Sequence, residues 1–304
     1  MKTTLTIRTT LLCAAMIAGA AFAQDAKWLP ADVSGVARVN TKALRAIPFL
    51  KTLAEKGVKD SAAPQFSNIA VPEWLKGMED QIDMVLAGFF PKAGNGNGSS
   101  CGFVTGTFDS AKVAAELVKN GCKTETVGGV TTYINRDAKG GGQWITFPRK
   151  GLAVAADSET AFLKALAAMN GKAKGLAGDS MYARALSKDY PVVAAINSAG
   201  LFENGEQLPM LNTPPPKFIG FTLRQKGDNA VIANLTGVFG DAEAAKALVD
   251  GLNGLKMISI MKMSADPNGA ELAKFLTSVS IANNDKNAIV SAVIDQALVD
   301  ALNK

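Results

Sequence analysis

The sequence predicts an α+β protein made of a tandem duplicated repeat, with a large, mainly antiparallel sheet and helices packed on one face. Three observations lead to this prediction. Short apolar segments outnumber helical ones, turn residues join many of these segments as hairpins, and similar segments recur in the same order along the chain. A hydrophobic fraction of 48% over 304 residues supplies ample material for a core.

The repeat is clearest between residues 105–118 and 236–249, where seven of fourteen positions are identical. Three further pairs follow the same order: 88–89 with 220–221, 32–40 with 189–197, and 161–166 with 297–302. Because all four pairs keep their order, we predict a first α+β repeat at 24–178 and a second at 179–304. Residues from about 80–170 and 215–304 should then superpose with one strand order.

Alternation, caps and turns define the elements of the first repeat. Thr41 begins a helix after the first strand, Asp109 or Ser110 caps a second helix, and Ser158 begins a third. Gly128-Gly129 is typical of a tight hairpin turn. The expected strands are 33–40, 83–90, 102–108, 123–127, 130–135, 143–147 and 152–156, and the expected helices are 41–56, 111–120 and 158–169.

The second repeat follows a similar plan. Asp266-Pro267 is a typical helix start, and Asn284-Asp285 is a turn between two strands. The expected strands are 192–197, 218–224, 230–239, 257–263, 279–283 and 288–293, and the expected helices are 241–252 and 295–302.

The first 23 residues have the pattern of a secretory signal peptide. Lys2 and Arg8 precede an apolar stretch at 11–18, and a small-x-small pattern ends at Ala23. We therefore expect cleavage between Ala23 and Gln24 and export to the periplasm or the extracellular medium.

Composition excludes several function classes. The chain has no histidine, which excludes Ser-His-Asp and Cys-His catalysis and histidine zinc sites. Loss of Lys2 and Arg8 with the signal leaves 30 basic and 27 acidic residues, scattered without a basic run, so no nucleic-acid partner is implied. No later apolar run is long enough for a transmembrane segment, and no cofactor motif is present.

The layout resembles secreted bacterial proteins of uncharacterised function built from two tandem α+β repeats. The resemblance rests on the signal peptide, on Leu29-Pro30-Ala31-Asp32, and on the strand, hairpin and helix pattern of 126–169. It implies the fold and an envelope location, and it carries no established activity.

Two patterns near residue 260 are candidate sites. Ser259 and Lys262 match the S-x-x-K of serine acylases, but that motif needs a helix and this segment is expected to be a strand. Met257, Met261 and Met263 would share one face of that strand, as Cu(I) ligands or, more simply, as core residues.

Three other patterns favour surface structure over chemistry. The loop at 94–100 and the glycines at 140–142 lack the ending of a phosphate-binding loop and are expected to be turns. Asp80 and Asp83 could form a hydrolase pair, but their sequence spacing does not fix the required separation.

Cys101 and Cys122 are the only cysteines after signal cleavage, and an oxidising compartment favours a disulfide between them. Strand rise and helix rise bring Cys122 back to the level of Cys101. The bond therefore requires the strands at 102–108 and 123–127 to be neighbours. The alternative is two buried free thiols.

These observations predict a non-enzymatic exported envelope protein, a scaffold or binding module for an unknown envelope component. The main alternative is a carrier of a small apolar ligand or lipid, since such sites leave little trace in a sequence. A hydrolase that uses carboxylates alone is the third possibility.

Overall fold

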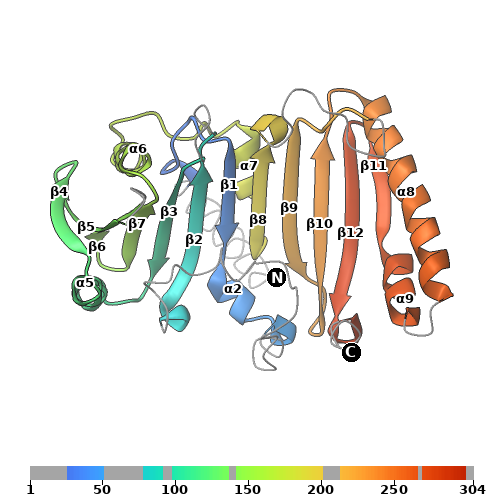
Figure 1. Cartoon of the computed structure of the whole chain (residues 1–304), viewed down its shortest axis with the longest axis horizontal. Coiled ribbons are helices and arrows are strands. Elements are labelled where there is room, and N and C mark those ends of the chain that lie inside the picture. Colours follow the sequence, from blue (N-terminus) through green and yellow to red (C-terminus); the bar gives the residue numbers. More distant parts are fainter. Residues whose placement is uncertain are drawn as a thin grey trace, which may run out of the picture. The chain divides into compact units, whose positions relative to one another are not determined.

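The protein is an α+β fold with one large antiparallel sheet and helices packed against it. The computed structural model describes residues 26–50, 78–91, 98–136, 142–200, 213–265 and 269–298. In this part of the chain twelve strands follow the order β11-β12-β10-β9-β8-β1-β2-β3-β7-β6-β5-β4 (Figure 1). The signal peptide, with Ala23 and Gln24, lies outside the described residues.

The chain forms two compact units that interleave in the sequence. One runs up to Ala37 and again over Val85–Asp189, and the other comprises Arg38–Met84 and the chain from Tyr190 onward. The third change of unit, between Asp189 and Tyr190, lies near the predicted boundary at 178/179. The contiguous division into 24–178 and 179–304 did not anticipate that 38–84 belongs with the second unit.

The first unit contains most of the predicted hairpins. Its strands are β3 (Ser100–Gly106), β4 (Lys123–Val127), β5 (Val130–Arg136), β6 (Gly142–Arg149) and β7 (Leu152–Ala156), while β1 (Gly35–Val39) and β2 (Ile82–Phe89) contribute to both units. Gly128 and Gly129 have φ of 61° and 80°, as the turn between β4 and β5 requires.

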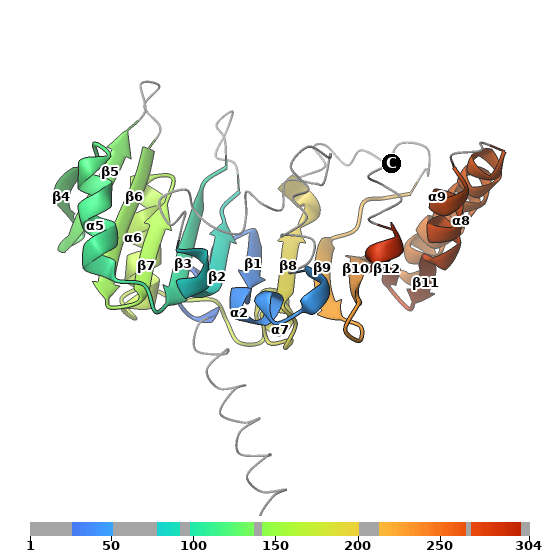
Figure 2. The same ribbon diagram turned by 90° about the horizontal axis from the view of Figure 1, so that it is seen from below.

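Two helices of this unit begin where the sequence indicates, whereas α7 (Met181–Leu186) was not predicted. Asp109 caps α5 (Ser110–Lys119) by accepting from the amides of Ala111 and Lys112, and Ser158 caps α6 (Glu159–Met169). Val113 and Leu117 form the buried stripe of α5, which lies against β5 (Figure 2). Short α7 follows α6.

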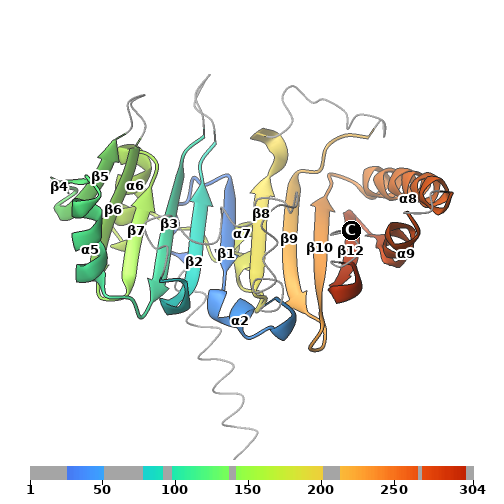
Figure 3. The ribbon, with the colours of Figure 1, turned by 60° about the horizontal axis from the view of Figure 1, so that its bottom comes forward.

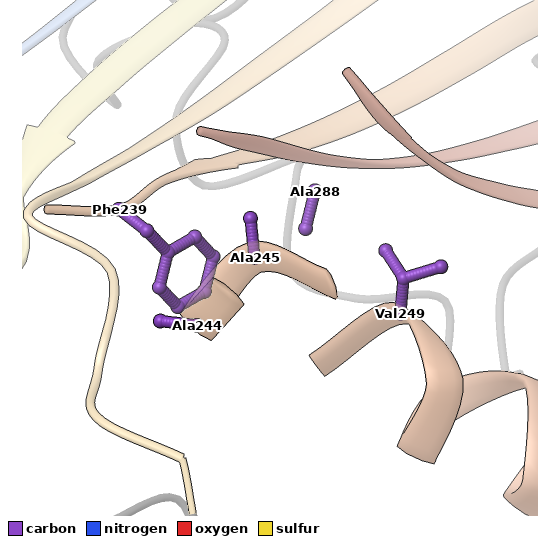
Figure 4. Packing of buried hydrophobic residues seen from close by; sticks show 5 residues of the cluster. All are labelled: Phe239, Ala244, Ala245, Val249 and Ala288. Carbon is purple, nitrogen blue, oxygen red and sulfur yellow. The ribbon is translucent and has the colours of Figure 1, made fainter. Parts of the chain in front are cut away.

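The second unit pairs β8 (Val192–Asn197), β9 (Phe218–Gln225), β10 (Ala230–Val238), β12 (Asn287–Asp295) and β11 (Ser280–Asn284) in that order. Its helices are α2 (Thr41–Arg45), α8 (Ala242–Ser264) and α9 (Ala270–Ser278). Phe239 and the first turns of α8 pack on Ala288 of β12 and form a core cluster (Figure 4).

The predicted strand at 257–263 is wrong, because α8 continues through these residues. The short apolar run at 257–263, interrupted by Ser259 and Lys262, is compatible with a strand or with a buried helix, and here it is helical. The predicted helix start at Asp266-Pro267 lies outside the described residues. Of the helix predicted at 295–302 only 295–298 are described, where Asp295 ends β12 and 296–298 are helical.

Both halves share a strand order, β1-β2-β3-β7-β6 in one and β8-β9-β10-β12-β11 in the other. Phe108 and Phe239 follow equivalent strands, are 0% and 3% exposed, and precede the caps Asp109 and Asp241. The β4–β5 hairpin has no counterpart, since α8 and α9 fill that stretch of the second half. The duplication itself remains a prediction, with which this strand order agrees.

Candidate functional site: an apolar sheet face

An apolar surface covers the middle of one face of the second unit's sheet. Leu235 of β10 lies directly opposite Phe221 of β9 and Val290 of β12, so the three side chains point to the same face. We call this surface the apolar sheet face, and it consists of Ala194, Phe221, Ala233, Leu235, Val290 and Ala292.

Helical segments cover the two ends of this face. Ile47 and Phe49, just after α2, pack on Val231 at one end. At the other end Ala245 of α8 packs on Ala288. These contacts place both helical segments on the same side of the sheet, with the apolar sheet face between them.

Leu235 is the most unusual residue of this surface. It lies on a strand that is hydrogen-bonded on both sides, yet it is 48% exposed. Phe221 and Val290 beside it are half-buried. A leucine at the centre of a sheet is normally covered by a packed layer, so this exposure is the feature that requires an explanation.

The opposite face of the same strands carries a polar row. The Asn234 side-chain amide donates to Thr222 Oγ1 at 3.3 Å and its carbonyl accepts from Ser291 Oγ at 2.7 Å. Thr222 and Ser291 are the cross-strand partners of Asn234 in β9 and β12. These hydrogen bonds satisfy the side-chain amide of Asn234. They also oppose a one-residue shift in strand register, because that shift would turn Asn234 to the apolar sheet face.

The predicted disulfide between Cys101 and Cys122 is not formed in the structure, where both are buried free thiols. Strands β7, β6 and β5 lie between β3 and β4, which places the two strands about 19 Å apart along the sheet. A disulfide needs Cα atoms within about 7 Å. The assumption that β3 and β4 are neighbours was therefore the error.

Each cysteine has a structural environment of its own. Cys101 lies opposite Ala156 in β3, and burial raises its pKa to about 12. The amide of Cys122 donates to Leu117 O at 3.0 Å and closes the C-terminus of α5, after Gly121 with φ of 91°. Burial also raises the pKa of Cys122.

The S-x-x-K pattern lies on a helix, so the objection that this segment would be a strand was wrong. Ser259 and Lys262 are on α8, but Lys262 is exposed. A lysine that acts as a general base needs burial that disfavours its charged form. The pattern therefore has no enclosed site in which to act.

The methionines do not form one stripe. Met257 and Met261 are one helical turn apart on α8 and are 65% and 63% exposed, whereas Met263 is half-buried on another side. The single strand face required for three thioether ligands is absent from this segment. Their exposure also contradicts the simpler assignment of Met257 and Met261 to the core.

The remaining predicted patterns do not form a site among the described residues. Asp80 is exposed, Asp83 is half-buried in β2, and the two loops at 94–100 and 140–142 lie largely outside the described residues. Within the described ranges no three His, Cys, Asp or Glu side chains gather as metal ligands. None of the helices in these ranges is long and apolar enough to span a membrane.

Sequence reasoning missed the apolar sheet face. Val231, Ala233 and Leu235 alternate as the buried side of any strand would, and nothing local distinguishes an uncovered position from a covered one. Only the position of the helices among the described residues reveals that Leu235, in the middle of this face, is exposed.

Comparison with known proteins shows the fold alone. No protein-family model matches the chain, and no curated protein sequence is significantly similar to it. Crystal form I of TP0453 is similar at 12% identity with a TM-score of 0.53, covering 91% of this chain and 95% of that one. Crystal form IV of TP0453 gives 12% identity and a TM-score of 0.51, covering 91% and 94%. The chain thus shares its α+β architecture with TP0453 over nearly its whole length.

Proposed function

We propose that this protein is a non-enzymatic, exported binding module of the cell envelope that carries an apolar ligand on the apolar sheet face. The observation that carries the proposal is the 48% exposure of Leu235 at the centre of the sheet. An apolar ligand would cover this side chain and replace the missing packed layer.

The surroundings of Leu235 suit an acyl chain. Phe221 and Val290 flank it in the neighbouring strands, and the small side chains of Ala233 and Ala292 follow one pair further along. The surface offers no charged group, so recognition would rest on burial of hydrocarbon. A long-chain lipid is the ligand class that this chemistry fits.

The chemical features support binding over catalysis. The chain lacks histidine, and the thiol of Cys101 is buried with a pKa raised to about 12. A nucleophilic cysteine needs a lowered pKa and access to substrate. The leader sequence, with the predicted cleavage between Ala23 and Gln24, supports the envelope location.

The test is a Leu235→Glu variant compared with the natural protein. Native mass spectrometry of protein purified from its own host should show a retained lipid on the natural protein and none on the variant. A fluorescent fatty acid should bind the variant at least about tenfold more weakly, because binding of its hydrocarbon chain would bury the carboxylate of the new glutamate without a partner.

A Leu163→Glu variant is the matched control. Leu163 is a 39% exposed leucine on α6 of the first unit, so the same change there should leave lipid binding intact. A natural protein that retains no lipid and binds no fatty acid would refute the carrier role. The scaffold role would then be tested by a pulldown from the native envelope.

A further inference from the structure

The C-terminal half of α8 exposes a second apolar surface, which is separate from the apolar sheet face. Leu255, Met257, Ile258 and Met261 are 41%, 65%, 47% and 63% exposed. Their spacings of three and four residues place them in one connected strip, which we call the α8 strip. Together they expose an area on the order of 400 Å², which is in the range of apolar patches that bind a partner.

The other side of this helical segment is already occupied. α9 lies alongside α8 (Figure 3). The ammonium of Lys256 donates to Val279 O at 2.5 Å, at the C-terminus of α9. The fixed position of α9 leaves the α8 strip pointing away from it, so neither α9 nor the sheet can cover the strip in this fold.

Charge distinguishes between the possible occupants. Residues 251–264 contain no acidic residue; Lys256 is bound to carbonyls on the α9 side, and Lys262 is exposed beside the strip. In a symmetric pair of these helices Lys262 of one copy would find no carboxylate in this segment of the other. An anionic surface, by contrast, is complementary to this segment.

We propose that the α8 strip docks the protein onto the surface of an anionic phospholipid bilayer. Met257, Ile258 and Met261 enter the boundary between headgroups and acyl chains, and Lys262 beside them contacts phosphate groups. The helix lies in the plane of the membrane and does not cross it. This inference rests on α8 and is independent of the ligand proposed for the apolar sheet face.

The experiment measures co-sedimentation of the exported, processed protein with vesicles of phosphatidylglycerol and phosphatidylcholine. We expect binding that weakens with salt and with the loss of phosphatidylglycerol. A double variant, Met257→Gln with Met261→Gln, should bind at least about tenfold more weakly, since it removes the two most exposed side chains of the strip. Circular dichroism verifies that the variant is folded.

Two further variants make the result specific. Val118→Gln changes a 50% exposed apolar residue on α5 and should leave vesicle binding unchanged. Leu235→Glu should weaken fatty-acid binding and leave vesicle binding unchanged, which separates this inference from the carrier role.

Failure of the natural protein to bind vesicles, or equal binding by the double variant, would overturn the proposal. So would light scattering that shows a dimer which the double variant dissociates, because the occupant would then be a second copy.

Discussion

Cys101 gives the protein a pH-dependent stability that can be measured directly. The side chain is 2% exposed in β3, and burial raises the pKa of its thiol from 9.0 to about 12. An acid whose pKa is raised on folding stabilises the native state fully below the unfolded pKa, and the stabilisation is lost as pH rises from 9 towards 12. The unfolded chain releases this proton first, so alkali favours unfolding.

The size of this change in unfolding free energy follows from the raised pKa of Cys101. At about pH 11 the thiolate of the unfolded chain should lower the free energy of unfolding by about 2–3 kcal/mol relative to about pH 8. Urea unfolding followed by circular dichroism, with reductant present, measures the change. A Cys101→Ala variant supplies the reference, since its other titrating groups are the same and only this contribution is lost.

Two results would refute this reasoning. If the natural protein and the Cys101→Ala variant lose stability equally between these pH values, Cys101 is not buried as the structure has it. If thiol titration of the denatured, unreduced protein yields no free thiol, Cys101 and Cys122 are bonded and the strand order β3-β7-β6-β5-β4 is wrong.

The remaining predictions concern two close contacts. Gly175→Ala should destabilise the protein by about 1–3 kcal/mol, because its Cβ would lie 2.1 Å from Lys27 O, whereas Gly178→Ala has no atom within 4 Å and should be nearly neutral in thermal unfolding. Lys256→Met should cost about 1–2 kcal/mol, since it removes the charged donor to Val279 O at the end of α9. Faster hydrogen exchange in α9 should accompany that loss, and unchanged exchange would contradict the contact.

Local signals determined much of this fold. Asp109, Ser158 and Asp241 cap helices because a short polar side chain can accept from the first free amides, and that chemistry is visible in the sequence. Strands β4, β7 and β8 match their predicted ranges, since alternation and flanking turns define them without reference to distant residues.

The segment at 257–263 shows where local signals fail. The segment is a short, mostly apolar run after Gly254, which is typical of a strand but does not distinguish a strand from a helix. The segment is helical because α8 continues from a well-capped start at Asp241 and packs against α9. Tertiary packing thus overrides a pattern that is ambiguous in a short apolar stretch.

The sequence by itself determined the fold class, the repeated order of segments, the helix caps and the absence of histidine chemistry. Only the tertiary structure decided which strands are neighbours, and in it β3 and β4 are separated by three strands and Cys101 and Cys122 are free thiols. It also decided that Leu235 and the α8 strip are open to solvent. The physical reason is that pairing between distant strands and coverage by distant helices depend on non-local contacts. The apolar pattern of a segment shows only which of its residues favour burial, and it does not show which element covers them.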